Sequence, residues 1–185
     1  MPRTAHRVSL VERVAAILDR GDAPYAVIGA AAMAARGVGR STRDLDLLTL
    51  STAWLDSTWW APLTAAGTEV SVSRGDAADP LAGVVRFHAK GERPVDLVVG
   101  RYRWQQRILE RAAPAVVGGT SLPTVLAPDI VLLKLYAGGS QDAWDIEQLL
   151  AGPDRESVLA AVGAELDDLP ARCRGLWTRI LSAGP

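Results

Sequence analysis

The chain has 185 residues, of which 49% are hydrophobic and 22% charged, so it carries enough apolar material for a folded core and is not a disordered chain. Its formal net charge of -1 gives no overall basic field, so a nucleic acid would have to bind a local basic patch. One cysteine and two histidines exclude a disulfide framework and a zinc site rich in cysteine or histidine.

The first two thirds of the chain mix helices with strands. Residues 8–18 predict an amphipathic helix, which ends near Gly21 and whose apolar face comprises Leu10, Val14, Ile17 and Leu18. A buried strand over 25–28 then leads directly into Gly29, and a helix over 30–35 follows. Further along, we expect a strand over 44–50, a helix over about 52–66, strands over 69–73, 84–89 and 95–99, a helix over 102–113 and a strand over 115–117.

The last third is helical in pattern. From Pro128 the helical periodicity is broken only at Gly138-Gly139, Gly152-Pro153 and Pro170. Strands mixed with helices, followed by helices alone, predict an α+β fold with a core over 1–127 and a C-terminal helical portion over 128–185, packed as one unit. Because no apolar run approaches the ~18 residues of a membrane span and the N-terminus has no signal-peptide stretch, we expect a cytoplasmic protein.

The strand that ends at Gly29 predicts a phosphate-binding turn. A helix begins at once after the glycine, and the first backbone N–H groups of a helix have no partner within it. A glycine there lets a phosphate approach the backbone closely. We therefore expect the N–H groups of Gly29 and Ala30 to bind phosphate.

Three aspartates predict a metal site beside this turn. The period of two in the strand over 44–50 puts Asp44 and Asp46 on one face, and Asp96 lies inside the apolar strand over 95–99. Carboxylates that lie side by side repel one another, and Mg²⁺ relieves this repulsion while keeping sites for water and substrate phosphates. Such a group facing a phosphate turn is what two-metal phosphoryl or nucleotidyl transfer requires.

Each of these features also has a structural interpretation. An Asp-x-Asp pair is more often a solvated strand end, and Asp96 alone is also explained as a charge that keeps an edge strand soluble. The functional interpretation depends on the order of the parts: strand, glycine turn, helix, strand with paired aspartates, and a later strand with one aspartate.

These motifs resemble the nucleotidyltransferase superfamily that includes DNA polymerase beta and the kanamycin nucleotidyltransferases. The series Arg40, Thr42, Asp44 and Asp46 after a glycine is more closely similar to the abortive-infection AbiEii-type nucleotidyltransferases, which are often toxins of toxin–antitoxin pairs. Residues 129–137 and 141–146 are similar to later helices of that type, so the resemblance spans roughly residues 7 to 150. It implies a nucleotidyltransferase-like mixed sheet, Mg²⁺ and a nucleoside triphosphate (NTP).

The resemblance also implies roles for individual residues. Asp44, Asp46 and Asp96 would hold Mg²⁺, and Asp96 would also help to activate the acceptor hydroxyl; Arg40, Thr42 and Lys134 would assist phosphate binding. The acceptor would be an RNA such as tRNA, and an antitoxin protein would be a partner. Two positions depart from the pattern, because Ala30 stands where the superfamily has Gly or Ser, and Gln141 stands where the related helix often carries Arg.

Lys134 is the one charge within an apolar helical run over 130–137, and lysine occurs elsewhere only at Lys90. A buried lysine is rare unless it is paired, so Lys134 either reaches nucleotide phosphates or pairs with Asp142 for stability. On the following helix we place Asp142 at the margin of the apolar face and Asp145 further round. Asp142 either orients Lys134 or activates the acceptor, or it only stabilises the first turn of its helix.

Two surface groups bear on the acceptor. Arg103, Arg107 and Arg111 recur along one helical stripe, which is either an RNA backbone track or a solvated face paired with Glu110 and its neighbours. The tryptophans over 54–60 form either a partner-binding patch or ordinary core packing. Transfer to a small hydroxyl compound such as an antibiotic, and a nucleotide- or partner-binding module without turnover, are the alternatives to an RNA acceptor.

Overall fold

The computed structural model describes residues 8–39 and 42–183, and within them the core is one mixed sheet of seven strands. The strands are β1 (Tyr25–Ile28), β2 (Leu45–Thr49), β3 (Glu69–Arg74), β4 (Gly83–His88), β5 (Val95–Val99), β6 (Ala113–Val117) and β7 (Thr120–Thr124). Their order across the sheet is β3-β4-β5-β2-β1-β7-β6. β2 is parallel to β5 and β1 to β7, whereas the other neighbours are antiparallel. The predicted α+β class is confirmed.

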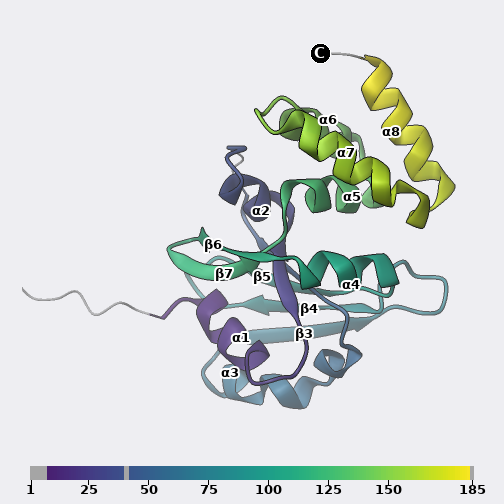
Figure 1. The fold of residues 1–185 in the computed structure, drawn as a ribbon. Helices are drawn as coiled ribbons and strands as arrows, with labels where there is room; N and C mark the ends of the chain where they lie inside the picture. The colour runs from purple at the N-terminus through teal and green to yellow at the C-terminus, as the bar shows by residue number, and fades with distance from the viewer. Residues whose placement is uncertain (1–7, 40–41, 184–185) are drawn as a thin grey trace, which may run out of the picture.

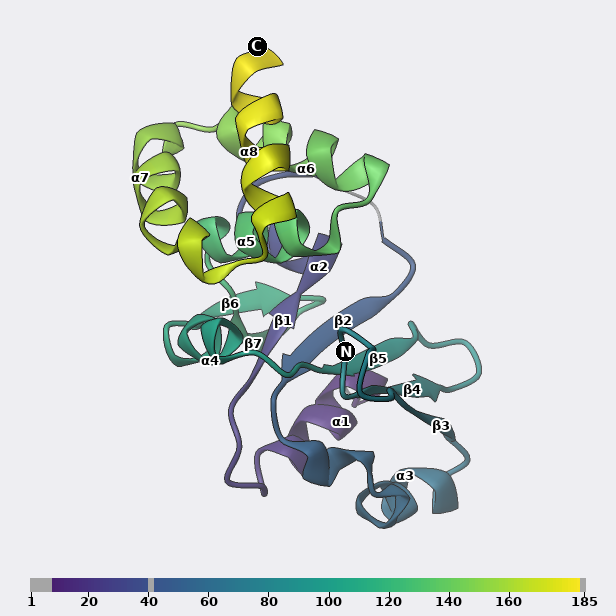
Figure 2. The same cartoon turned by 90° about the vertical axis from the view of Figure 1, so that its right-hand side faces the viewer.

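Most of the helices lie at two ends of the molecule, and α4 lies between them (Figure 1, Figure 2). They are α1 (Leu10–Leu18), α2 (Gly29–Ala35), η1 (Thr52–Leu55), η2 (Ser57–Trp60), α3 (Ala61–Ala65), α4 (Arg103–Glu110), α5 (Ala127–Ala137), α6 (Ser140–Leu150), α7 (Arg155–Glu165), η3 (Leu166–Asp168) and α8 (Ala171–Ala183). Helices α5–α8 lie at the end where β1 runs into α2, and α1 and α3 lie at the opposite end (Figure 1, Figure 2). The C-terminal helices thus lie at the same end of the molecule as the turn at Gly29, where α2 begins.

Helix α1 forms as the sequence predicts. Ser9 caps it, because its hydroxyl accepts from the Glu12 N–H while the Glu12 carboxylate accepts from the Ser9 N–H. The predicted apolar face is buried in the core: Leu10, Val14, Ile17 and Leu18. Burial of four such side chains supplies more stabilisation than the helix propensity of so short a segment.

The single helix predicted over 52–66 is wrong. The chain there forms η1, η2 and α3 in succession. Asp56 adopts an extended conformation, and its carboxylate accepts from the Thr58 N–H at 2.9 Å, which ends one helical turn and starts the next. Pro62 is the second residue of α3, in the first turn, where the N–H that proline lacks would have no partner within the helix.

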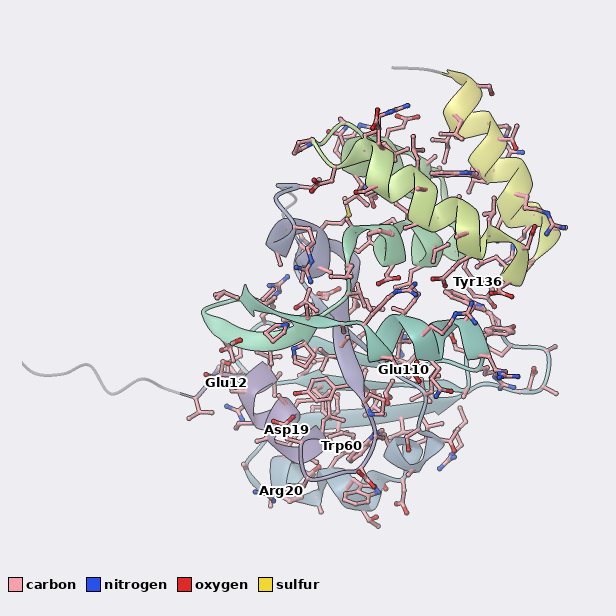
Figure 3. The ribbon with its side chains drawn as sticks, in the orientation of Figure 1. Glu12, Asp19, Arg20, Trp60, Glu110 and Tyr136 are labelled. Carbon is pink, nitrogen blue, oxygen red and sulfur yellow. The ribbon has the colours of Figure 1, made fainter. Side chains whose placement is uncertain are left out.

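The tryptophans of this segment pack mainly into the core. Trp54 and Trp60 are buried, and the Trp60 ring meets Phe87 of β4 edge-on at 4.7 Å between centroids (Figure 3). The Trp60 indole N–H donates to the Trp54 carbonyl at 2.9 Å, so its polar atom is satisfied. Trp59 alone of the three is exposed, which confirms the packing interpretation for the other two.

The sequence analysis misses strand β7. It pairs with β6 in a hairpin whose two turn residues, Gly118 and Gly119, both have positive φ. A Gly-Gly pair between two extended runs is a strong hairpin signal, but Pro123 in a polar run argues against a strand. Pro123 is accommodated because β1 pairs with β7 at Thr124 and not at the proline.

The C-terminal helices break where the sequence predicts. Helix α5 ends at Gly138, which has φ of +71°, and α7 and α8 begin after Gly152-Pro153 and Pro170. Among the described residues, no helix is long and apolar enough to cross a membrane. The division between residues 1–127 and 128–185 stays a prediction.

Candidate active site

The turn between β1 and α2 is shaped around Gly29. Residues 25–27 of β1 are buried, and the chain passes from β1 into α2 at Gly29, which has φ of +64°. A Cβ at this position would lie 2.5 Å from Oδ2 of Asp46, so only glycine fits. Ala30 follows in the first turn of α2, whose cap residue Ile28 offers no side-chain acceptor to the N–H groups.

Asp46 and Asp96 stand side by side on one face of the sheet. Parallel pairing of β2 with β5 puts the two in register, and on the other side of β2 the partner of Asp46 is Ile28, which precedes the turn. Both side chains are half-buried, between the alternating core residues of their strands. Two of the three predicted acids therefore meet directly beside the glycine turn.

Asp44 lies just outside β2, in an exposed bend, so the strand begins one residue later than the alternation predicts. The Thr42 hydroxyl donates to the Asp44 carbonyl at 2.8 Å and accepts from the Asp44 N–H. Arg93 Nη2 donates to the same carbonyl at 2.8 Å. Thr42 thus orders the loop that presents Asp44. Arg40 lies outside the described residues.

The acids are electrostatically coupled. The pKa of Asp46 is raised by burial and by the carboxylates of Asp96 and Asp44, while Arg93 and Lys134 oppose the rise. The pKa of Asp96 is raised by burial and by Asp44, against the guanidinium of Arg86. Like charges so placed are unfavourable together, and a cation bound among them removes the conflict.

The donor set fits Mg²⁺. Carboxylate oxygens are its preferred protein ligands, and it needs only one or two of them because waters and substrate phosphates complete its shell. Within residues 8–39 and 42–183 no group of three acidic, histidine or cysteine side chains is arranged to hold a metal ion, and this includes Asp44, Asp46 and Asp96. The three-aspartate metal site therefore stays a prediction, and an ion held by Asp46 and Asp96 would take its remaining ligands from water and substrate.

Lys134 lies on the helical portion and belongs to a compact charge group. Its Nζ is 2.8 Å from Asp142 Oδ1 and 2.5 Å from Asp145 Oδ2. Asp142 also accepts from the Gly139 N–H at 2.8 Å, so it stabilises the first turn of α6 and holds Lys134 at once. Asp145 is fully buried, so its expected place further round from the apolar face than Asp142 is wrong. The charge of Asp145 is accommodated because Lys134 reaches it.

Two charged residues of this region escaped the sequence analysis. Arg86 of β4 is the register partner of Asp96, and its Nε lies 3.4 Å from Asp96 Oδ2. Arg93 holds the Asp44 loop. A single arginine in an alternating strand looks like any solvated position, so only the strand pairing reveals the contact.

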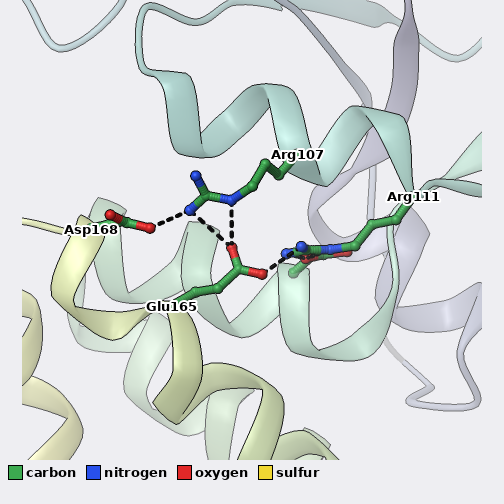
Figure 4. A network of polar contacts seen from close by, with 5 residues as sticks. Arg107, Arg111, Glu165 and Asp168 are labelled. Atoms are coloured by element: carbon green, nitrogen blue, oxygen red, sulfur yellow. Dashed lines mark hydrogen bonds and ion pairs between the residues drawn. The ribbon is translucent and has the colours of Figure 1, made fainter.

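The arginine stripe joins the core to the helical portion. Arg111 donates to Asp129 through Nε at 2.8 Å and through Nη2, and Nη1 lies 2.5 Å from Glu165 Oε1. Arg107 contacts Glu165 and Asp168 (Figure 4). The predicted pairing with Glu110 is wrong, because that carboxylate accepts from Gln106 and the arginines face the end of α7. Two arginines of the suggested RNA track are thus engaged by acids.

No model of a protein family matches the chain, and no curated protein matches it. Solved structures do. The solution structure of the antibiotic-resistance factor ANT(2'')-Ia matches with a TM-score of 0.55 and 15% identity, over 85% of this chain and 90% of that one. A crystal structure of ANT(2'')-Ia in complex with adenylyl-2''-tobramycin gives a TM-score of 0.54 and 16% identity, over 84% and 94%. At these identities the likeness concerns the fold, which is nucleotidyltransferase-like as the motifs predicted.

Proposed function

We propose that the protein is a nucleotidyltransferase that moves a nucleoside monophosphate from an NTP to an acceptor hydroxyl. The observation that carries the proposal is the in-register pair of Asp46 and Asp96 beside the glycine turn, with Gly29 left without a side chain to make room for the Asp46 carboxylate. The acceptor oxygen attacks the α-phosphorus, the bond from that phosphorus to the bridging oxygen breaks, and pyrophosphate leaves.

Mg²⁺ would be held by Asp44, Asp46 and Asp96, and when bound it supplies charge neutralisation for the triphosphate and the developing oxyanion. The N–H groups of Gly29 and Ala30 bind phosphate oxygens. Asp96 takes the proton of the acceptor hydroxyl, a role that suits a carboxylate whose pKa lies above its usual range.

In the proposed site the helical portion supplies Lys134. Lys134 opposes the rise in the pKa of Asp46, and in this proposal its ammonium binds the triphosphate. Asp142 holds Lys134 in place, and Thr42 orders the Asp44 loop rather than contacting phosphate. A phosphate contact of Arg40 is proposed from the sequence motif alone.

Two acceptor classes remain in the proposal. An RNA such as tRNA, with the protein acting as a toxin beside an antitoxin partner, follows from the resemblance of the motif around Asp44 and Asp46 to the AbiEii type. A small molecule such as an antibiotic is favoured by the ANT(2'')-Ia structures, one of which contains an adenylylated tobramycin.

The test is transfer of label from each α-labelled NTP, with Mg²⁺, to total tRNA or to an aminoglycoside panel. Wild type is compared with Asp46→Asn and with the control Asp22→Asn, which alters an exposed carboxylate that has no ion pair or hydrogen bond within the described chain. We expect transfer by wild type and Asp22→Asn and not by Asp46→Asn. Absence of transfer to both acceptor classes by wild type contradicts the proposal, and equal transfer by Asp46→Asn contradicts the metal assignment.

A further inference from the structure

Arg86 lies on the side of Asp96 away from the phosphate turn. Four residues on neighbouring strands are register partners and form one row across the sheet: Ile28 of β1, Asp46 of β2, Asp96 of β5 and Arg86 of β4. Figure 2 shows β4 on the far side of β2 and β5 from β1. Neighbouring strands are about 4.8 Å apart, so Arg86 stands about one strand spacing beyond Asp96. If the NTP occupies the turn side, this is the acceptor side.

Most N–H donors of the Arg86 guanidinium have no acceptor within the described chain. It approaches Asp96 with Nε alone at 3.4 Å, and its side chain is 47% exposed. In the part of the chain that the structure describes, it makes no other ion pair or hydrogen bond. Arg111, by contrast, donates to the buried Asp129 through both Nε and Nη2, as an arginine with a structural role does.

The surface around Arg86 is open and polar. The outward residues of β3 and β4 there are exposed, with Ser71 opposite Arg86 and Glu69 opposite His88. His88 is near enough to lower the pKa of Asp96. Ser71 adds a neutral hydroxyl, so Arg86 is the permanent cation at this edge of the site.

We propose that Arg86 is a specificity-determining residue that selects an acceptor with a phosphate ester near the reacting hydroxyl. The inference rests on the proposed function and names its substrate class. A guanidinium donates to phosphate through two parallel N–H groups, whereas a polycationic acceptor such as tobramycin would place ammonium groups against it. The phosphate ester belongs either to an RNA backbone or to a phosphorylated small molecule.

The test measures binding separately from turnover. Purified protein with Mg²⁺ and a non-hydrolysable NTP analogue is titrated with tRNA, ribose 5-phosphate, ribose and tobramycin, and transfer to each is measured with the labelled NTP. The variants are Arg86→Ala, Arg86→Lys and the control Arg20→Ala, which lies at the end of the molecule away from Tyr136 of α5 (Figure 3). Thermal unfolding verifies that each variant folds.

We expect wild type to bind tRNA or ribose 5-phosphate in preference to ribose and tobramycin, and whichever binds identifies the source of the phosphate. Arg86→Ala should weaken that binding about tenfold or more, with partial rescue by Arg86→Lys, no change in Arg20→Ala and an unchanged KM for NTP. Equal binding by Arg86→Ala, preference for tobramycin, or no phosphate-dependent binding overturns the inference. Arg86-dependent binding without transfer supports Arg86 as a residue that binds a phosphate ester and contradicts the proposed transfer reaction.

Discussion

The Asp46 carboxylate fills the space in which a side chain on Gly29 would lie. An ideal Cβ at Gly29 would stand 2.5 Å from Asp46 Oδ2, and Gly29 has φ of +64°. The turn and the acid are therefore fitted to each other, and the distance between the proposed phosphate-binding amides and the proposed metal ligand is set by the absence of one methyl group.

Gly29→Ala should abolish transfer and destabilise the fold. The positive φ alone costs an alanine about 1–2 kcal/mol, and the close contact displaces the Asp46 carboxylate in addition. We expect a lower midpoint in urea unfolding and transfer reduced by more than tenfold. Gly37→Ala is the matched control, since Gly37 also has positive φ but has nothing within 4 Å of its added Cβ. A comparable loss of transfer in both variants would show that backbone strain alone matters.

Asp46→Asn should stabilise the metal-free protein at neutral pH. The folded-state pKa of Asp46 is raised by burial and by Asp96 and Asp44, so the folded chain holds this proton more tightly than the unfolded chain. Stability from the protonated form is complete below the usual pKa of an aspartate, about 3.9, and is lost as the pH rises through the folded value. The asparagine does not ionise and avoids that loss.

The measurement is urea unfolding in a chelator at several pH values from acid to neutral. The difference between Asp46→Asn and wild type should vanish at low pH and favour the variant at pH 7. Added Mg²⁺ should then stabilise wild type and not the variant. A variant that is less stable than wild type at pH 7 in the chelator would contradict the assigned origin of the shift.

The sequence predicts the proximity of Gly29, Asp46 and Asp96 better than it predicts the elements around them. Asp46 and Asp96 are recognisable because each interrupts an apolar strand, and Gly29 because it directly follows one. Parallel pairing of β2 with β5 brings the two acids together, and antiparallel pairing of β1 with β2 brings Asp46 to the glycine turn. Helix boundaries depend on local competition instead. Asp56 separates η1 from η2 within the predicted helix by accepting a backbone N–H, which periodicity does not reveal.

Contacts between distant elements are the part that sequence reasoning could not supply. Arg86 and Arg111 are ordinary arginines in the sequence, and their partners Asp96 and Glu165 are 10 and 54 residues away. The pairing of β4 with β5 and the position of the end of α7 near α4 decide these contacts. Lys134 is the exception, because a lone lysine in an apolar helix predicts a paired charge even before its partner is identified.

Arg111→Ala should destabilise the fold far more than Arg107→Ala. Arg111 neutralises the fully buried Asp129, and removing one partner of a buried ion pair costs about 3 kcal/mol. Arg107 is 41% exposed and its partner Asp168 is also exposed, so its loss should cost about 1 kcal/mol or less. Urea unfolding of the two variants measures both values. Equal losses of unfolding free energy would contradict the structural role of the Arg111–Asp129 ion pair between α4 and α5.

Lys134→Met separates the two roles of this lysine when it is combined with Asp145→Asn. The single variant leaves the buried Asp145 without the ammonium that lies 2.5 Å from it, so we expect a loss of about 3 kcal/mol in urea unfolding at pH 7. The double variant removes the buried charge together with its counter-charge and should recover most of that stability. Transfer activity should stay lost in the double variant, because the ammonium that we propose to bind the triphosphate is still missing. If activity returns together with stability, Lys134 serves the fold alone, and the phosphate-binding role assigned to it is wrong.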